Sequence, residues 1–121
     1  RRPGDDGRAT ALRLIGEVGG LDAILYDDEI DTGRTIASAA RLVRDRGAAR
    51  VSAMATHAVL SPPSVRVLRR APLAEIAVTN TIAVPAGRMP PRLVVIDAAP
   101  LLADVIRRIH VGESVGALFP T

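Results

Sequence analysis

Acidic residues directly precede small polar residues in one segment of the sequence, residues 21–38, which reads LDAILYDDEIDTGRTIAS. The acidic residues are Asp27, Asp28, Glu29 and Asp31. The residues that follow them are Thr32, Gly33, Arg34 and Thr35. A loop of Gly and hydroxyl residues that leads into a helix binds phosphate through unpaired backbone N–H groups, whereas carboxylates repel phosphate. A sugar phosphate suits both parts, because its phosphate would bind the helix N-terminus and its hydroxyls would donate hydrogen bonds to the carboxylates.

The residues on either side of the acids predict the elements that position them. Residues 21–26 contain a short apolar run that is typical of a buried strand. From 35 to 46 apolar residues recur at helical spacing, basic residues occupy the last turn and Gly47 follows, which is a common way for a helix to end. The simpler alternative is a strand-to-helix turn in which Asp and Thr only cap the helix. The number of acids in so short a segment favours a binding site.

Further strands and helices alternate along the chain. We predict strands at 51–56, 76–79 and 93–96, helices at 64–70 and 100–110, and a weak edge strand at 9–15. Because the strands are continuously apolar, they are expected to form a parallel sheet covered by helices on both faces. Ligands bind at the carboxyl ends of the strands in such sheets, which is where the acidic segment falls. The sequence therefore predicts an α/β fold with a binding site at one strand end.

Composition narrows the classes of ligand and partner. The chain has 121 residues, enough for one domain, and contains no Cys, while its two histidines, His57 and His110, lie far apart. A dedicated zinc site is therefore not expected. No apolar run approaches the roughly 20 residues that cross a bilayer and no signal peptide opens the sequence, so we expect a cytoplasmic protein without membrane contact. All sixteen basic residues are scattered Arg and only 2% of residues are aromatic, so a small anionic ligand is expected rather than nucleic acid.

Several segments, in order along the chain, resemble the ribose-phosphate pyrophosphokinase family, also called phosphoribosyl pyrophosphate synthetase. The acidic segment is similar to the ribose-phosphate-binding signature of the type I phosphoribosyltransferase fold, in which two hydrophobic residues, two acids and two further residues precede D-T-G-x-T. Residues 56–62 resemble T-H-G-V-F-S-G, and residues 78–82 read V-T-N-T-I as in the family. Residues 99–103, 106–110 and 113–119 resemble A-P-L-L-A, I-R-R-I-H and E-S-V-S-x-L-F. The resemblance covers nearly the whole chain.

The resemblance implies a doubly wound, parallel-sheet α/β domain of the phosphoribosyltransferase type. Residues 1–121 would form most of the C-terminal domain of such an enzyme, without the N-terminal part of that domain and without the N-terminal domain. The family joins ATP and ribose 5-phosphate into phosphoribosyl pyrophosphate and AMP with Mg²⁺, and it assembles into homo-oligomers, commonly hexamers built from dimers. These ligands, this cofactor and this assembly are what the resemblance predicts for the whole protein.

The same resemblance assigns roles to individual residues. The residues expected to hold ribose 5-phosphate are Arg2, Asp27, Asp28, Asp31, Thr32, Gly33, Arg34 and Thr35. His57 would lie near the nucleotide, and Ser114 and Phe119 match a region linked to regulation between subunits. No catalytic residue and no metal ligand is assigned, because the family's catalytic Lys would precede Arg1 and the chain contains no Lys. The isolated chain is therefore expected to be inactive.

Three departures from the family pattern leave other functions open. Arg34 replaces the second Gly of D-T-G-G-T, while Ala58 and Pro62 replace family Gly residues. If position 34 needs a positive φ, Arg would strain or shift the loop; alternatively, its guanidinium would add a phosphate contact. A non-catalytic regulatory or interaction subunit, as in the synthetase-associated proteins, is therefore the first alternative. A phosphoribosyltransferase that consumes phosphoribosyl pyrophosphate is the second.

Overall fold

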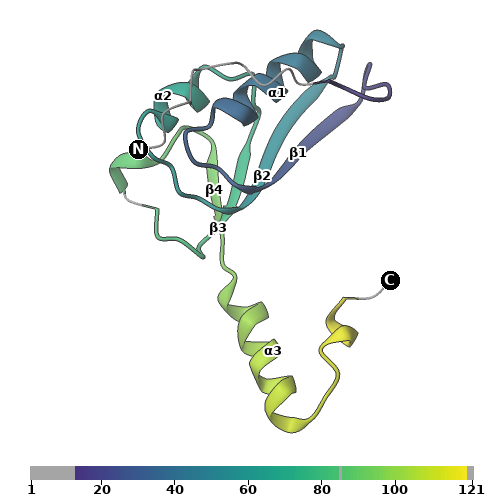
Figure 1. Ribbon diagram of the computed structural model, residues 1–121, viewed down its shortest axis with the longest axis vertical. Helices are drawn as coiled ribbons and strands as arrows, with labels where there is room; N and C mark the ends of the chain where they lie inside the picture. The colour runs from purple at the N-terminus through teal and green to yellow at the C-terminus, as the bar shows by residue number, and fades with distance from the viewer. Residues whose placement is uncertain (1–12, 85, 120–121) are drawn as a thin grey trace, which may run out of the picture.

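The computed structural model describes residues 13–84 and 86–119, and its strands and helices alternate along the chain (Figure 1). The strands are β1 (Asp22–Glu29), β2 (Arg50–His57), β3 (Ile76–Thr79) and β4 (Leu93–Ile96). The helices are α1 (Arg34–Asp45), α2 (Ser64–Arg69) and α3 (Ala99–Val111). Short 3-10 turns are found at Ala86–Arg88 and Gly116–Leu118. The predicted strands at 76–79 and 93–96 are confirmed, and the other elements predicted within these ranges are present with shifted ends.

The four strands form one parallel sheet in the order β1-β2-β3-β4, as predicted. Asp27 on β1 is the register partner of Ala55 on β2, and Glu29 is the partner of His57. Parallel strands bring their carboxyl ends to the same edge of a sheet. The acidic end of β1 and the histidine at the end of β2 are therefore neighbours at this edge.

The first strand is longer than its hydrophobic pattern predicts. The apolar run ends at Tyr26, but β1 continues to Glu29 because the backbone stays paired with β2. Strand pairing uses backbone groups, so acidic side chains do not interrupt it. The strand predicted at 21–26 therefore ends later than expected: three of the acids extend it, and the loop is confined to residues 30–33.

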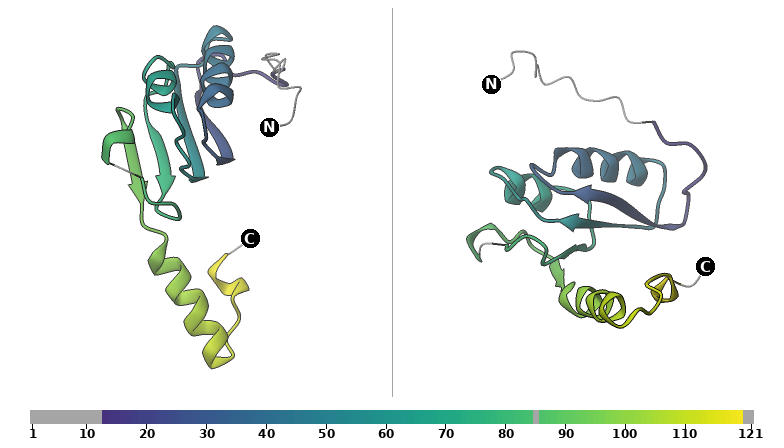
Figure 2. Two further views of the ribbon diagram at one scale, coloured as in Figure 1. Left: turned by 60° about the vertical axis from the view of Figure 1, so that its left-hand side comes forward. Right: turned by 60° about the horizontal axis from the view of Figure 1, so that its bottom comes forward.

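Helices α1 and α2 cover one face of the sheet, where an aliphatic core forms (Figure 2). When strands advance in one direction, right-handed crossovers place every connecting helix on the same face. The residues that α1 buries recur at helical spacing: Ile36, Ala37, Ala40 and Val43. They share one cluster with buried residues of the sheet, which include Val51, Ala53, Ile76 and Val78.

The opposite face of the sheet is open in the described residues, which corrects the expectation that helices cover both faces. Ile24 and Tyr26 on β1 are 65% and 75% exposed. The strand order does not reverse, so the connecting helices stay on the first face. Helix α3 follows β4 but projects away from the sheet and buries none of its residues (Figure 1). The parallel α/β fold is confirmed, whereas residues 13–84 and 86–119 do not contain the second helical layer of a doubly wound sheet.

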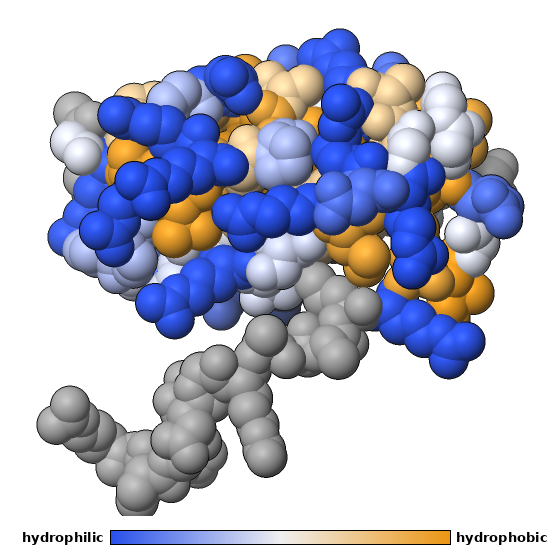
Figure 3. Space-filling view, turned by 90° about the horizontal axis from the view of Figure 1, so that it is seen from above, coloured by the Kyte–Doolittle hydropathy of each residue, from blue (hydrophilic) through white to orange (hydrophobic). Residues whose placement is uncertain are grey.

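The weak edge strand predicted at 9–15 is not found in the described residues. Residues 9–12 of the predicted edge strand lie outside the described residues, and residues 13–15 are not in a strand. Hydrophilic residues are interspersed with apolar ones over the face seen from above (Figure 3). Within the part of the chain that the structure describes, no helix is long and apolar enough to cross a membrane.

Candidate functional site

A hollow of about 280 Å³ opens at the carboxyl end of β1 and reaches the first turn of α1. Its walls combine the acidic strand end with the small polar loop. The lining residues are Asp27, Asp28, Glu29, Ile30, Asp31, Thr32, Gly33, Thr35 and Ile36. The structure therefore brings together most of the residues predicted to bind a sugar phosphate, namely Asp27, Asp28, Asp31, Thr32, Gly33 and Thr35.

Backbone hydrogen bonds orient the acidic side chains at the strand end. The Oδ1 atom of Asp27 accepts the N–H of Asp28 at 3.0 Å, and the Oδ1 atom of Asp28 accepts the N–H of Glu29 at 2.9 Å. Among the described residues, no hydrogen bond reaches the Oδ2 atom of either carboxylate. Each carboxylate can therefore accept a hydrogen bond from a sugar hydroxyl without giving up its backbone contact.

The other wall of the hollow is the N-terminus of α1. The helix begins at Arg34 after Gly33, its N-cap residue provides no side-chain hydrogen bond, and its first turn contains no acidic residue. The first N–H groups of a helix lack partners within the helix and lie at the positive end of its dipole. An anion bound here would satisfy them, so this wall suits phosphate while the strand end suits hydroxyls.

Gly33 allows the loop to turn directly into α1 while packing closely on α2. Its φ is +74°, in the left-handed region that favours glycine. A Cβ atom at this position would lie 2.8 Å from Cγ of Leu68 on α2, closer than real Cβ contacts. The carbonyl of Gly33 accepts the N–H of Ala37 at 3.0 Å, which starts the hydrogen-bond pattern of the helix. The position of the loop and of the start of α1 therefore depends on a glycine here.

Arg34 follows this glycine and is the first residue of α1. Its φ is not positive, because the left-handed conformation falls on Gly33, so the backbone strain considered for the arginine is not present. Its side chain is exposed, and Arg34 is not among the residues that line the hollow. Its position therefore gives no support to the alternative, a guanidinium contact with phosphate. Arg2, the other arginine predicted at the site, lies outside the described residues.

Polar residues at the ends of β2 and β3 form a second cluster beside the hollow. His57 ends β2, and its Nδ1 atom lies 2.9 Å from Oγ1 of Thr81. The hydroxyls of Thr79 and Thr81 lie 2.7 and 3.0 Å from the carbonyl oxygen of Thr56. The sequence predicts His57 near a nucleotide but assigns no role to the two threonines. The signal that points to them is a run of polar residues, T-N-T, at the end of an apolar strand.

Asn80 and Asp97 connect the ends of β3 and β4. The Nδ2 group of Asn80 donates to Oδ1 of Asp97 at 2.7 Å, and Oδ1 of Asn80 accepts the N–H of Ala98 at 2.9 Å. Asp97 Oδ1 also accepts the N–H of Ala99, the first residue of α3, at 3.0 Å. These bonds hold the point at which α3 leaves the sheet. Sequence motifs do not reveal the pair, because the two residues meet only when β3 pairs with β4.

The pKa of Asp97 is held below its ordinary value of 3.8, first by the N–H of Ala99 and second by the Asn80 amide. Because the folded-state pKa is lowered, this contact stabilises the start of α3 above the ordinary pKa, and the stabilisation is lost as the pH falls through the folded-state pKa. In an Asn80→Ala variant we expect the Asp97 pKa to rise but to stay below its ordinary value. NMR titration of the Asp97 carboxyl carbon measures it, and an unchanged pKa in the variant would contradict this role of Asn80.

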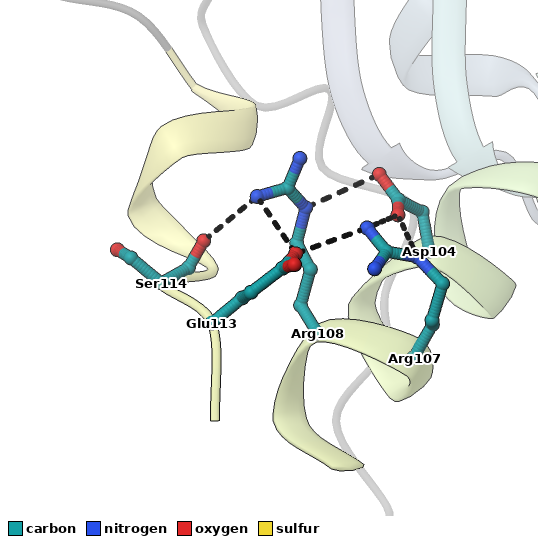
Figure 4. Close-up of polar contacts among 5 residues, drawn as sticks. All are labelled: Asp104, Arg107, Arg108, Glu113 and Ser114. Atoms are coloured by element: carbon teal, nitrogen blue, oxygen red, sulfur yellow. Dashed lines mark hydrogen bonds and ion pairs between the residues drawn. The ribbon is translucent and has the colours of Figure 1, made fainter. Parts of the chain in front are cut away.

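The segment that follows α3 is held by ion pairs and contains a residue predicted to act in regulation, Ser114. Arg107 contacts Asp104 at 2.9 Å and Glu113 at 3.1 Å, and Nη1 of Arg108 donates to the Ser114 carbonyl at 3.2 Å (Figure 4). The hydrogen bond from Arg107 holds the pKa of Asp104 below its usual range. These contacts fix the segment against the end of the helix.

Neither residue predicted to act in regulation lines the hollow. Phe119 is 59% exposed, and Ser114 makes its contact at the end of α3. Residues 13–84 and 86–119 also contain no group of three or more His, Cys, Asp or Glu side chains placed to hold a metal ion.

Comparisons with known proteins point to one family. The family described as the phosphoribosyl synthetase-associated domain matches residues 7–120. The chain is 49% identical over 111 residues to the ribose-phosphate pyrophosphokinase of Nostoc sp., a match that spans 92% of this chain and 34% of the relative. It is 49% identical over 112 residues to the ribose-phosphate pyrophosphokinase of Prochlorococcus marinus, again with 92% of this chain and 34% of the relative covered.

A solved structure agrees with these relatives. The crystal structure of phosphoribosylpyrophosphate synthetase from Mycobacterium smegmatis matches with a TM-score of 0.77 and 44% identity, over 83% of this chain and 34% of that chain. The chain thus spans about a third of the length of the relatives that it matches. The resemblance inferred from the sequence motifs is confirmed, because the matches extend over most of this chain. The chain belongs to the family described as the phosphoribosyl synthetase-associated domain.

Proposed function

We propose that this chain supplies the ribose 5-phosphate-binding part of a ribose-phosphate diphosphokinase, which converts ATP and ribose 5-phosphate into phosphoribosyl pyrophosphate and AMP. The observation that carries the proposal is the hollow at the end of β1, where carboxylates and an uncapped helix N-terminus share one cavity. The names of the relatives, ribose-phosphate pyrophosphokinase and phosphoribosylpyrophosphate synthetase, support it. In the whole protein this chain would form most of the second, phosphoribosyltransferase-like domain.

The two walls of the hollow would bind the two ends of the ligand. The phosphate would accept hydrogen bonds from the first N–H groups of α1 and from the hydroxyls of Thr32 and Thr35. The ribose hydroxyls would donate hydrogen bonds to Asp27 and Asp31. Because one wall favours anions and the other repels them, the sugar phosphate would bind in a single direction.

The reaction depends on positioning and charge neutralisation more than on covalent participation of the protein. The 1-hydroxyl of ribose attacks the β-phosphorus of ATP, a new O–P bond forms, and the bond from this phosphorus to the AMP oxygen breaks. A ribose held at both ends would keep its 1-hydroxyl in one place, which is the contribution proposed for this chain. The chain contains no Lys, so a Lys that contacts the triphosphate would come from outside it, and we expect no turnover by the 121-residue chain alone.

Mg²⁺ would neutralise charge on the phosphates when it is bound together with ATP. The hollow suits such an ion, because Asp27 and Asp28 each have one carboxylate oxygen outside the hydrogen bonds of the described residues. Mg²⁺ usually binds one or two carboxylates and takes its other oxygens from substrate and water. The described residues contain no group of three or more side chains placed to hold a metal ion. A Mg²⁺ ion that binds one or two carboxylates does not need such a group.

Calorimetric titration of the 121-residue chain with ribose 5-phosphate tests the proposal, with inorganic phosphate and ribose as controls. We expect ribose 5-phosphate to bind more tightly than either control, because only this ligand contacts both walls of the hollow. Equal affinity for ribose 5-phosphate and inorganic phosphate would indicate a general anion site and would contradict the proposal. A folded chain that binds none of the three ligands would also contradict it.

A non-catalytic interaction subunit is the second candidate function, and the exposure of α3 favours it. Ile106 and Ile109 on this helix are 67% and 66% exposed, and the open sheet face adds Ile24 and Tyr26. Exposed apolar surfaces of this kind mark protein interaction sites. Such a subunit would associate with other chains without making phosphoribosyl pyrophosphate. Failure of the calorimetric test together with stable association would favour it.

Under either function we propose that the chain assembles with copies of itself. An Ile106→Glu variant is expected to reduce self-association, because burying an unpaired charge in an apolar contact is costly. A Ser38→Glu variant places the same charge at an exposed residue of a different helix, α1, and serves as the control. Sedimentation velocity measures the assembly state of each protein. A parent chain that is monomeric at high concentration would contradict the proposal.

A further inference from the structure

We propose that Thr81 holds His57 in the tautomer with its proton on Nδ1, so that Nε2 accepts a hydrogen bond from a hydroxyl of the sugar phosphate in the hollow. The identity of the ligand rests on the proposed function. The inference gives a role to a histidine outside the lining of the hollow and to a threonine that follows a different strand.

His57 lies directly beside the wall of the hollow. It is the last residue of β2 and the register partner of Glu29 on β1. Its carbonyl oxygen accepts the N–H of Ile30 at 2.9 Å. Glu29 and Ile30 both line the hollow, and the His57 side chain is exposed. A ligand that fills the hollow and extends along the carboxyl edge of the sheet therefore reaches the place of the imidazole.

The hydrogen bonds around Thr81 determine which ring nitrogen carries the proton. Each threonine hydroxyl has one proton to donate, and a carbonyl oxygen can only accept. The hydroxyls of Thr79 and Thr81 both lie within hydrogen-bond distance of the Thr56 carbonyl, at 2.7 and 3.0 Å. When both donate to it, Oγ1 of Thr81 is left as an acceptor toward Nδ1 of His57, 2.9 Å away. Nδ1 then carries the proton.

The opposite assignment makes fewer hydrogen bonds. If the Thr81 hydroxyl donated its single proton to Nδ1, it could no longer donate a hydrogen bond to the Thr56 carbonyl. The first assignment pairs both hydroxyls with that carbonyl and pairs Nδ1 as well. Nδ1 stays paired in the same way if the Thr79 hydroxyl donates instead to Oγ1 of Thr81, 2.9 Å away. Oγ1 of Thr79 also accepts the N–H of Thr81 at 3.3 Å, which keeps the two side chains together. In the neutral ring, Nδ1 therefore carries the proton and Nε2 is unprotonated.

An unprotonated Nε2 is a hydrogen-bond acceptor, and this matches the chemistry of the hollow. The carboxylates of Asp27 and Asp31 accept hydrogen bonds, and ribose hydroxyls donate them. A third acceptor at the end of β2 extends the hydroxyl-binding wall from one strand to the next. An imidazole, unlike a further carboxylate, adds no negative charge near the phosphate. Thr81 is a positioning residue, since it acts on the ligand only through His57.

NMR of the imidazole nitrogens tests the tautomer directly. Long-range ¹H–¹⁵N spectra of the 121-residue chain, recorded about two pH units above the ordinary histidine pKa, distinguish protonated from unprotonated ring nitrogens. The chain has two histidines, and the exposed His110 serves as an internal reference. We expect His57 to carry its proton on Nδ1 and His110 to show the tautomer mixture of a free imidazole. A proton on Nε2 of His57 would overturn the inference.

Two variants of similar shape separate the effect of Thr81 from that of its neighbour. Thr81→Val removes the acceptor, so His57 should change to the same mixture as His110. Thr79→Val removes the contacts of the Thr79 hydroxyl with Thr81 but leaves the contact between Thr81 and the Thr56 carbonyl in place, so His57 should keep its proton on Nδ1. Unchanged backbone amide signals from the sheet show that each variant is folded. Loss of the tautomer in both variants, or in neither, would overturn the assignment to Thr81.

Titration with ribose 5-phosphate and with inorganic phosphate tests the contact with the ligand. Ribose 5-phosphate should shift Nε2 of His57 together with the amides of Gly33 and Thr35, and inorganic phosphate should shift the amides alone. Thr81→Val should weaken ribose 5-phosphate binding about 2- to 10-fold, the size of one hydrogen bond, and leave phosphate binding unchanged. Loop shifts without a shift at Nε2 would overturn this inference and leave the proposed function standing. No shift in either place would overturn both.

Discussion

Replacing Gly33 with alanine is expected to lower the free energy of unfolding by about 3 kcal/mol. Two costs add. The φ of +74° puts an alanine in the left-handed region, which costs roughly 1–2 kcal/mol. The new Cβ would lie 2.8 Å from Cγ of Leu68, and relieving an overpacked contact typically costs about 1–3 kcal/mol. Urea unfolding with an unchanged m-value would measure the sum.

Gly47 provides the matched control for this prediction. Its φ is +89°, but a Cβ there would meet only Cα of Gly19 at an ordinary 3.5 Å. Gly47→Ala should therefore show the backbone cost alone, roughly 1–2 kcal/mol. Gly33→Ala should also cost less in a Leu68→Ala background, because the atoms that meet the new Cβ are gone. Equal losses for the two glycine variants would show that the contact with Leu68 does not matter.

The same Gly33→Ala variant is expected to lose tight binding of ribose 5-phosphate for a separate reason. Relieving the contact with Leu68 requires the loop to move away from α2. That movement shifts the loop and the start of α1, with Thr32 and Thr35, relative to Asp27 at the strand end. The two ends of the ligand could then no longer bind together. Full affinity in a folded but destabilised variant would contradict this dependence on loop position.

An Asp31→Asn variant is expected to bind ribose 5-phosphate roughly 10- to 100-fold more weakly than the parent chain. Asp31 lines the hollow between the strand end and the helix, where it is proposed to accept a hydrogen bond from a ribose hydroxyl. Hydrogen bonds to a charged group contribute about 1.5–3 kcal/mol. Asparagine is neutral, and it replaces one acceptor oxygen with a donor group. Calorimetric titration measures the affinity of both proteins.

Inorganic phosphate should not bind more weakly to the Asp31→Asn variant. Removing a negative charge beside the anion site reduces repulsion, so phosphate affinity should stay the same or increase. Asp22→Asn removes the same charge at the other end of β1, outside the hollow, and serves as the control. If ribose 5-phosphate and phosphate affinities fell together, the loop would be damaged and the assignment of Asp31 to the sugar would be contradicted.

Elements whose signals are local could be predicted from the sequence. The strands at 76–79 and 93–96 are short runs dominated by apolar residues, and their predicted bounds match β3 and β4. The strand at the acidic segment shows where this approach fails. Its apolar run ends at Tyr26, but pairing with β2 carries β1 on to Glu29, and a pairing partner cannot be read from the run itself. The existence of a strand could therefore be predicted from the local sequence, whereas its end depended on pairing with a neighbouring strand.

The conformation of the loop shows a similar division. The motif left open whether Arg34 would need a positive φ. In the structure Gly33 takes the left-handed conformation and Arg34 begins α1, because the loop reaches its helix one residue earlier. The close approach of Gly33 to Leu68, a residue on another helix, also leaves no room for a side chain at position 33. A glycine in the motif was visible in the sequence, but the contact that requires it was not.

The composition of the hollow follows from the sequence alone, because its acids, hydroxyls and glycine are consecutive and a strand-to-helix loop keeps consecutive residues close together. The packing of Gly33 on Leu68, the contact of His57 with Thr81 and the open face of the sheet appear only in three dimensions. The two contacts join residues that are far apart in the chain. The open face results from crossovers that all pass on one side of the sheet. Such arrangements depend on how strands and helices pack together, and no local pattern of residue types records them.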